Sequence, residues 1–416
     1  MNIYLVGGAV RDALLGYPYT EKDWVVTGAS PTELESLGFS SVGKDFPVFL
    51  HPKTKEEYAL ARTERKTRPG YTGFEFNTSP SVTLEQDLSR RDLTINAIAK
   101  DERGQIIDPF NGKRDIEKKL LRHVSPAFSE DPVRLLRVAR FAARYYHLGF
   151  SVAPETMTLL KSMVANGEID ALVAERCWKE FHKALNERHP EIFILVLRDC
   201  GALARIMPEL DAVFGVPQVE KYHPEIDTGL HSLMSLKQAC ELSDDSSVRF
   251  ASLMHDLGKA LTEPEKWPSH HNHEKCGLPA LAQLCERLKV PKEHYELARL
   301  AMEFHTHTHR AFELKPTTIL KLLKRTDAYR KPERFLQFLL CCKADAQGRT
   351  GWEQTCYPQA NYLAGAREIA NAVKTNTFVQ QGLKGKAIGD ALESERMYRL
   401  ENYVKPVKAA LNKIPL

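Results

Sequence analysis

The stretch LVGGAVRDALLG (residues 5–16) decides how this chain begins to fold. Ile3 to Val6 has the pattern of a short apolar strand, and Ala9 to Leu15 has that of a helix. The two glycines between them let the backbone approach a ligand closely, because no Cβ intervenes. The N-terminal amides of such a helix favour an anion, and Arg11 adds a positive charge. The stretch predicts either an ordinary strand–turn–helix corner or a loop that binds phosphate.

A pair of carboxylates follows in EKDWVV (21–26). Glu21 and Asp23 lie two residues apart at the entry to an apolar strand, Trp24 to Thr27, so both side chains are expected on the same face. Two carboxylates on one face repel each other unless a cation joins them, and oxygen ligands of this kind suit Mg²⁺. Next to an anion-binding loop, the pair favours a metal–nucleotide site over a solvated strand entrance.

The pattern changes from mixed to helical further along the chain. After a turn-rich break at DPFNG (108–112), strand patterns fade, and a second boundary is indicated by VFGVPQVEKYHPEIDTG (213–229). We therefore expect an α+β domain over 1–125 and all-α segments over 126–215, 216–350 and 351–416. Within the first domain the pattern predicts three more strands and a second helix, at Phe46 to Leu50, Glu57 to Ala61, Gln105 to Ile107 and Leu93 to Ala99.

Two arginine-rich motifs accompany this change. In RRDLTINAIA (90–99), Asp92 could cap the following helix and an arginine fork could reach a triphosphate, although a capped surface helix with solvated arginines fits equally well. In EDPVRLLRVARFAAR (130–144), Asp131 and Pro132 form a good helix start.

The second motif places four arginines on one helical face. At about 100° per residue the face is about 120° wide, with Leu135 and Ala139 opposite. Like charges so placed repel one another, so we expect the face to meet an anion or an acidic partner rather than to be a plain solvated surface. The four are Arg134, Arg137, Arg140 and Arg144.

Composition narrows the class of protein. A chain of 416 residues predicts two to four domains, and its net charge of +4 permits nucleic-acid binding without arguing for it. Its eight cysteines form no CxxC pair and are expected to be reduced. No apolar run approaches the roughly 20 residues of a membrane span, and no basic lead-in suggests a signal peptide. We expect a cytoplasmic protein without a membrane partner, as a monomer or homodimer.

In this order the motifs resemble those of class II tRNA nucleotidyltransferases, the CCA-adding enzymes, and most closely the bacterial multifunctional form with an HD domain. The resemblance covers essentially the whole chain. It implies a polymerase-β-like head over 1–125, a helical neck and body over 126–215, an HD phosphohydrolase domain over 216–350 and a helical tail over 351–416. The motifs that carry it are LVGGAVRDALLG, the acidic-x-acidic triplet, RRDLTINAIA, DPFNG, EDPVRLLR and AERCWKEF (174–181).

The resemblance implies addition and repair of the tRNA 3′-terminal CCA from CTP and ATP, without a nucleic-acid template. Glu21 and Asp23 would hold the catalytic Mg²⁺, although the family most often has aspartate at the first position. The tRNA 3′-hydroxyl would attack the α-phosphorus in line and release pyrophosphate. Gly8, Arg11 and Arg91 would contact the incoming nucleotide, Glu130, Asp131 and Arg134 would read its base edge, and Arg137 and Arg140 would bind the triphosphate. Asp12 is expected to hold Arg11 or to cap the helix.

The histidine-rich region resembles HD-superfamily phosphohydrolases between about 228 and 346. His255 and Asp256 end an apolar helix, RFASLMHDLGKA (249–260), with Gly258 as its expected stop. The order H…HD…D implies a metal that activates water to hydrolyse a phosphomonoester or a cyclic phosphodiester. Imidazole with carboxylate suits Ni²⁺, Mn²⁺ or Zn²⁺, with Mg²⁺ also allowed. The implied ligands are His231, His255, Asp256 and Asp345, with Lys259 near the phosphate.

The histidines of SHHNHE (269–274) and HTHTH (305–309) are expected to be mostly surface side chains on loops, with one or two near the metal. We expect the helical C-terminal half to hold tRNA by its shape and phosphates. Its basic tail, 395–413, has a helical pattern that a merely solvated helix would share.

Two other functions share some of these features. Bacterial poly(A) polymerase has the same head motifs, but the short lead before Leu5, the arginine-poor segment VGKDFPVFLHP (42–52) and the HD module favour CCA addition. The basic segment RTERKTRPGYTGF (62–74) resembles the family's flexible loop and favours full CCA over CC addition. A tRNA-binding protein with an inert site is the third reading, and the retained carboxylates and Arg134 argue against it.

Overall fold

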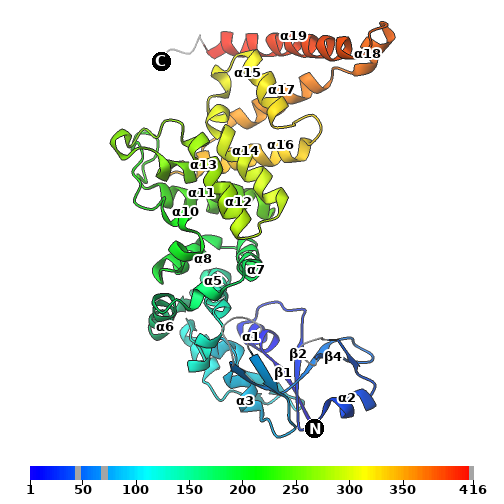
Figure 1. Cartoon of the computed structure of the whole chain (residues 1–416), viewed down its shortest axis with the longest axis vertical. Coiled ribbons are helices and arrows are strands. Elements are labelled where there is room, and N and C mark those ends of the chain that lie inside the picture. The colour runs from blue at the N-terminus through cyan, green and yellow to red at the C-terminus, as the bar shows by residue number, and fades with distance from the viewer. Residues whose placement is uncertain (43–47, 67–73, 412–416) are drawn as a thin grey trace. The chain divides into compact units, whose positions relative to one another are not determined.

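The computed structural model of this chain describes residues 1–42, 48–66 and 74–411, and it divides into two compact units, Met1–Ile206 and Met207–Leu416 (Figure 1). Unit 1 joins a mixed sheet to a group of helices, and unit 2 is helical. An α+β head followed by all-α segments is the predicted fold class, and it is confirmed. Parts of the predicted strand at Phe46 to Leu50 and of the segments 42–52 and 62–74 lie outside the described residues.

The sheet of unit 1 is buried on both faces. Its strand order is β3-β4-β5-β2-β1-β8-β9, with β1 antiparallel to β2 and β2 parallel to β5. Because side chains alternate along a strand, Val25 of β2 points into the cluster that contains Leu88 of α3, and Val26 points into the one that contains Leu34 of α2. The sheet strands are β1 (Asn2–Val6), β2 (Asp23–Thr27), β3 (Ser40–Ser41), β4 (Val48–Leu50), β5 (Glu57–Leu60), β8 (Ala99–Asp101) and β9 (Ile106–Ile107).

Short elements surround this sheet. The β6–β7 hairpin pairs antiparallel, and β10 pairs in parallel with β11. The strands are β6 (Thr63–Lys66), β7 (Phe74–Asn77), β10 (Leu120–Leu121) and β11 (Ser151–Val152), and the helices are α1 (Gly8–Leu15), α2 (Pro31–Ser36), α3 (Leu84–Ser89) and α4 (Gly112–Lys118). Of the head elements, the strands at Ile3 to Val6, Trp24 to Thr27, Glu57 to Ala61 and Gln105 to Ile107 and the helix at Ala9 to Leu15 are confirmed to within a residue.

The helix predicted at Leu93 to Ala99 is wrong. A single 3₁₀ turn, Thr94–Asn96, occupies its middle, and Ala99 already pairs with Val6 in the sheet. Asp92 does accept the Leu93 N–H (2.8 Å), but its carboxylate also binds Asn96 and a distant arginine. Tertiary bonds therefore replace the helix that the local pattern favours.

The helical part of unit 1 is built around α5, which packs against α7 and α8. Leu135 and Ala139 are completely buried in it, as the periodicity predicts. Asp131 accepts the Val133 N–H (3.1 Å), but Pro132 precedes the helix and does not form its first residue. The helices are α5 (Val133–Tyr145), α6 (Pro154–Ala165), α7 (Ala174–Leu185), α8 (Pro190–Asp199) and α9 (Ala202–Ile206).

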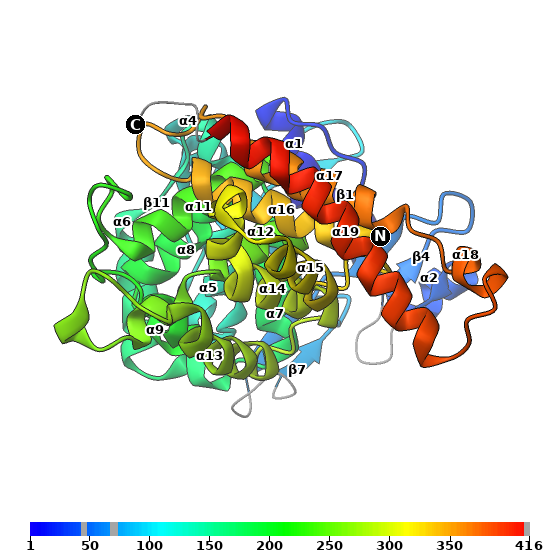
Figure 2. The same ribbon diagram turned by 90° about the horizontal axis from the view of Figure 1, so that it is seen from above.

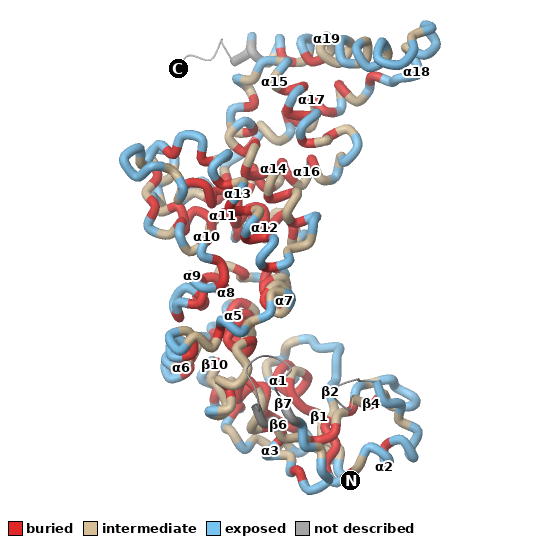
Figure 3. The backbone as a smooth tube through the Cα atoms, in the orientation of Figure 1, coloured by how far each residue is buried: buried red, intermediate tan, exposed pale blue. Residues whose placement is uncertain are grey.

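Unit 2 has its most buried helices in one packed group, α11, α12, α14 and α16, along which the buried tube runs in Figure 3. The helix α19 lies across α15 and α17 (Figures 1 and 2). No helix among the described residues is long and apolar enough to cross a membrane. The helices are α10 (Pro208–Asp211), α11 (Thr228–Leu242), α12 (Ser246–Met254), α13 (His273–Arg287), α14 (Lys292–His309), α15 (Pro316–Arg325), α16 (Pro332–Gln347), α17 (Pro358–Asn371), α18 (Thr375–Gln380) and α19 (Lys386–Leu411).

Gly258 does not stop a helix as predicted. The helix α12 ends at Met254, and Gly258 lies in the following 3₁₀ segment, Leu257–Leu261. A Cβ on Gly258 would lie 1.9 Å from the carbonyl oxygen of His273, because the segment packs directly on α13 at Gly277. The glycine is therefore needed for the close approach of two backbones rather than for a left-handed cap.

Two candidate active sites

A cavity of about 1020 Å³ in unit 1 is lined by every residue predicted to hold metal or nucleotide there except Glu130. At its base the chain turns from β1 into α1 at Gly7, whose φ of +68° a side chain would rarely adopt. A Cβ on Gly7 would also lie 2.8 Å from Arg91 Nη1. The cavity is lined by Gly7, Gly8, Arg11, Glu21, Asp23, Arg91, Asp131, Arg134, Arg137, Arg140, Arg144 and Arg176, among others.

Arg11 is held in place by its neighbours. Its guanidinium donates to both carboxylate oxygens of Asp12 (2.8 and 2.9 Å) and to Asn96 Oδ1 (2.5 Å). The hydroxyl of Tyr145 in turn donates to Asp12 (2.7 Å). The expectation that Asp12 holds Arg11 is confirmed, and the bonds fix a cation at the start of α1.

Glu21 and Asp23 bring two negative charges to the same cavity. Asp23 is the first residue of β2 and lies opposite Val6, next to the glycine turn. Partial burial and the charge of Glu21 raise the pKa of Asp23, and Arg91 only partly offsets this. A divalent cation would relieve this repulsion, so the donor set fits Mg²⁺.

The arginines of α5 face carboxylates of the same unit. Arg137 donates to Asp92 (2.7 Å) and Arg140 to Glu180 (2.6 Å), while Arg144 lies 3.6 Å from Asp12. Burial opposes the charge of Asp92, yet Arg137 and Asn96 hold its pKa well below the usual range. The predicted acidic partners are thus intramolecular, and they orient the arginines towards the cavity.

Arg176 is a site residue that sequence reasoning missed. It lies on α7 and donates to both oxygens of Asp131 (3.1 and 2.9 Å), while Arg134 donates to the carbonyl oxygen of Ala127 (2.9 Å). Arg176 lies in the family motif AERCWKEF, 45 residues from Asp131, and no local pattern connects the two residues. Arg176 fixes the carboxylate that was predicted to read the base.

In unit 2 the four predicted metal ligands come together. His231 on α11 and Asp345 on α16 lie 3.1 Å apart (Nε2 to Oδ1), and His255 Nε2 lies 3.7 Å from Asp345. Asp256 lies 3.2 Å from His255 and 3.8 Å from His231. All four side chains are buried, so a charge between them has little access to water.

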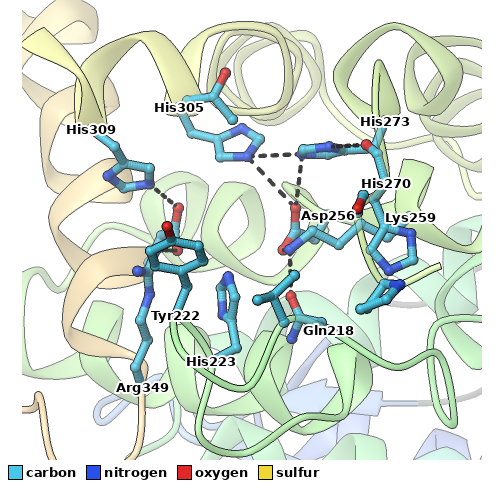
Figure 4. Close-up of a pocket in the computed structure, with 15 residues that line it drawn as sticks. Gln218, Tyr222, His223, Asp256, Lys259, His270, His273, His305, His309 and Arg349 are labelled. Atoms are coloured by element: carbon cyan, nitrogen blue, oxygen red, sulfur yellow. Dashed lines mark hydrogen bonds and ion pairs between the residues drawn. The ribbon is translucent and has the colours of Figure 1, made fainter. Parts of the chain in front are cut away.

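A second cluster adjoins the first and was not predicted residue by residue. His273 and His305 place Nε2 3.5 and 3.6 Å from Asp256 Oδ1 (Figure 4). They correspond to the one or two histidines expected near the metal site, but both are buried and lie on helices, His273 at the start of α13 and His305 on α14. The four-residue spacing of His305 and His309, one helical turn, was the available signal. His309 Nε2 lies 2.5 Å from Asp345 Oδ2.

Every histidine of the two clusters uses Nδ1 for a bond away from the centre. The acceptors are backbone carbonyls, and Glu225 in addition lies 3.0 Å from His231 Nδ1. If Nδ1 carries the proton, Nε2 keeps its lone pair for a metal. The bonded pairs are His231 with Gly348, His255 with Ser252, His273 with His270 and His305 with Ala301.

Unpartnered acceptors show that this donor set fits a metal. Among the described residues, both carboxylate oxygens of Asp256 and the Nε2 of His255 are buried without a hydrogen bond. The Oδ2 of Asp256 does form an ion pair with Lys259 (2.6 Å), so Asp256 Oδ1 and His255 Nε2 are the acceptors that lack a partner. Leaving such groups unsatisfied costs about 1–3 kcal/mol each, and more for a charge. Two carboxylates with imidazoles on either side suit one or two divalent transition metals.

Comparisons with known proteins find three family models that match parts of this chain. Residues 3–122 match the family described as Poly A polymerase head domain, 149–214 match Probable RNA and SrmB-binding site of polymerase A, and 228–331 match HD domain. A Teredinibacter turnerae protein named Multifunctional CCA protein is 62% identical over 96% of this chain and 98% of its own length. A namesake from Thioalkalivibrio sulfidiphilus is 58% identical over the same shares.

Solved structures show the same fold at lower identity. A CCA-adding enzyme in complex with CTP has a TM-score of 0.63 at 20% identity, over 99% of this chain and 92% of its own. The Thermotoga maritima CCA-adding enzyme complexed with tRNA has a TM-score of 0.60 at 20% identity, over 99% and 91%.

Proposed function

Because this chain belongs to the family of multifunctional CCA proteins and is a tRNA nucleotidyltransferase, we propose that it adds and repairs the 3′-terminal CCA of tRNA from CTP and ATP, and that its HD domain hydrolyses phosphate esters. The observation that carries the first half is one cavity that joins the carboxylates Glu21 and Asp23 to oriented arginines. Carboxylates suit the metal that a nucleotide brings, and arginines suit its phosphates.

The nucleotide would bind with its triphosphate between the start of α1 and the arginine face of α5. Gly7 and Gly8 leave the backbone open to the phosphates, while Arg11 and Arg91 lie beside them. Arg137 and Arg140 reach the cavity from α5. Because these guanidiniums are already held by carboxylates, little side-chain entropy is lost when the triphosphate binds.

Base selection would fall to Asp131 and Arg134. An arginine offers donors and a carboxylate offers acceptors, so the pair can match one Watson–Crick edge without a nucleic-acid template. Arg176 keeps Asp131 in one orientation through two bonds. Glu130 does not line the cavity, and we assign it no contact with the base.

Glu21 and Asp23 would hold Mg²⁺, which when bound activates the 3′-hydroxyl and neutralises the leaving pyrophosphate. The chain's own residues supply orientation: the glycine turn sets the phosphates next to the carboxylates, and the arginines balance the charge that moves to pyrophosphate.

In the HD domain, His231, His255, Asp256 and Asp345 would hold a divalent metal, with room for a second between Asp256, His273 and His305. A metal there would activate a water molecule for attack on phosphorus. Phosphomonoesters and 2′,3′-cyclic phosphodiesters are the proposed substrates, with Ni²⁺ or Mn²⁺ favoured over Mg²⁺ by the imidazole ligands. Lys259 lies 2.6 Å from Asp256 and lines the pocket, so it can meet a phosphate there.

The first test is incorporation into tRNA that lacks its last three nucleotides. CTP with ATP should extend it by three residues and stop, while ATP alone should leave it unextended. Long A-tails from ATP alone would instead identify a poly(A) polymerase, and no incorporation at all would contradict nucleotide addition.

The second test is hydrolysis of 2′,3′-cyclic AMP and p-nitrophenyl phosphate by protein stripped of metal and then titrated with Ni²⁺, Mn²⁺ or Mg²⁺. Activity should return with the transition metals. If no metal restores hydrolysis of either ester, the proposal for the HD domain fails, whatever the result of the first test.

A further inference from the structure

Two buried N–H donors beside the metal cluster of unit 2 have no acceptor among the described residues. They are Nε2 of Gln218 and Nε of Arg349, and both residues line a small cavity of about 180 Å³ next to Asp256 and Asp345 (Figure 4). Native structures rarely leave such donors unpaired, so an acceptor that binds in this cavity is the simplest explanation.

The orientation of Gln218 follows from its neighbour. The ammonium of Lys259 can only donate, and it donates to Oε1 of Gln218, so Nε2 must be the free end of the amide. Gln218 is only 3% exposed. The loop that carries Gln218 folds back, because the Gln218 N–H donates to the carbonyl oxygen of Ile226 (2.6 Å). Ile226 has a φ of +61°, which is strained for a β-branched residue. The structure thus maintains strain next to a buried, unpaired donor.

Arg349 approaches the cavity from the end of α16. One of its terminal nitrogens lies 3.3 Å from Asp345 Oδ1, and its guanidinium lies 5.6 Å from the ring centroid of Trp352. These contacts fix the plane of the guanidinium, but within the described parts of the chain Nε has no hydrogen-bond partner. Lys259 is paired with one metal-binding carboxylate and Arg349 with the other, so a cation borders each side of the cluster.

The cavity itself is too small for a nucleotide. Pockets that take drug-sized ligands measure about 300–1000 Å³, so this one has room for a phosphoryl group but not for a nucleoside. Tyr222 stands at its mouth and also lines the neighbouring cavities of about 770 and 620 Å³. Its side chain is 52% exposed, which leaves aromatic surface open to a base.

We propose that Gln218 and Arg349 bind the non-bridging oxygens of the substrate phosphate next to the metal cluster, and that Tyr222 stacks on the base of a nucleotide substrate. The proposal rests on the phosphohydrolase function proposed for this site and deepens it. It makes the natural substrate a nucleotide or an RNA 3′ end with a terminal or cyclic phosphate, rather than a small phosphomonoester. Two donors and a flanking lysine match the several acceptor oxygens that such a phosphate carries.

The test uses the full chain loaded with Ni²⁺ or Mn²⁺ and measures two quantities. One is the affinity for inorganic phosphate, by calorimetry and by competitive inhibition. The other is KM and kcat for 2′,3′-cyclic AMP and for p-nitrophenyl phosphate, which has no base. The variants are Gln218→Leu, Arg349→Lys and Tyr222→Ala, with the exposed Gln283→Leu, Arg330→Lys and Tyr398→Ala as matched controls.

Gln218→Leu and Arg349→Lys should each lower the affinity for inorganic phosphate at least about tenfold and raise KM for both esters. The amount of bound metal, the melting temperature and the rate of nucleotide addition should not change. Tyr222→Ala should raise KM about tenfold for the cyclic nucleotide alone. Unchanged phosphate affinity in both donor variants would overturn the phosphate pocket, and equal effects of Tyr222→Ala on both esters would overturn the base platform. If wild-type protein hydrolyses neither ester, the phosphohydrolase function fails, while phosphate calorimetry still decides whether these donors bind the anion.

Discussion

The two pockets of this molecule both combine carboxylates with cationic side chains, but they differ in the buried atoms that they leave without a hydrogen bond. Among the described residues that line the cavity of unit 1, the buried atoms without a hydrogen bond are donors, the Nε atoms of Arg91 and Arg144. In and beside the small pocket of unit 2, the described residues leave acceptors without a hydrogen bond at the metal cluster, both oxygens of Asp256 and the Nε2 of His255, and donors next to it on Gln218 and Arg349. An unpartnered donor indicates an absent anion and an unpartnered acceptor an absent cation, because either is costly when buried.

The two cavities also differ in volume. The cavity of unit 1 measures about 1020 Å³ and can hold a whole nucleotide, whereas the one beside the metal cluster measures about 180 Å³. If the proposed functions hold, unit 1 would bind a nucleotide through its phosphates, and the nucleotide would bring the metal with it. In unit 2 the protein itself would hold the metal, and the small pocket would admit only the reacting group.

Loss of a carboxylate from unit 1 should separate the two sites most sharply. Asp23→Asn should reduce nucleotide incorporation into truncated tRNA at least about a thousandfold, because the remaining carboxylate cannot hold Mg²⁺ alone. Hydrolysis of 2′,3′-cyclic AMP should stay within twofold of wild type. A parallel loss of hydrolysis would contradict two independent sites.

The reverse separation should come from Asp256→Asn, which should reduce the rate of ester hydrolysis at least about a hundredfold. Asp256 borders both histidine clusters, so its neutral isostere should lower the bound Ni²⁺ or Mn²⁺ measured by atomic absorption. CCA addition should be unaffected. His271→Ala, an exposed histidine of the same region, is the control, and full metal content in Asp256→Asn would refute the assigned ligand.

A smaller effect is expected from Arg134→Ala, which tests whether unit 1 separates base reading from phosphate binding. The ratio of kcat/KM for correct and incorrect nucleotide should fall about tenfold, since one bidentate partner of the base edge is lost. Inhibition by inorganic triphosphate should not change. If the variant kept its selectivity between correct and incorrect nucleotides, Arg134 would have no role in base recognition.

The smallest effect should come from Arg176→Lys, which keeps the charge but loses the two-pronged bond to Asp131. We expect selectivity between CTP and ATP to fall about threefold. The KM for each nucleotide at its correct step should be nearly unchanged. Arg205→Lys, whose exposed partner is Asp170, is the matched control. An effect as large as that of Arg134→Ala would mean that Arg176 itself contacts the base.

Local pattern was sufficient where a residue acts through its own element. Gly7 is needed at a left-handed turn, and the arginines of α5 share a face because of helical periodicity. The helix predicted over Leu93 to Ala99 failed because Asp92 bonds to Arg137, 45 residues away, and Ala99 pairs with β1. No local pattern contains such a partner.

The sequence by itself determined the α+β head, the helical remainder, the carboxylate pair with its glycine turn and the residues of the first histidine cluster. Only the tertiary structure decided that His273 and His305 meet Asp256, that Arg176 clamps Asp131 and that Gln218 and Arg349 are left with free donors. The physical reason is that periodicity fixes the direction of a side chain relative to its own backbone. Its partner depends on which helices pack together, as where Gly258 lets its segment close directly onto α13.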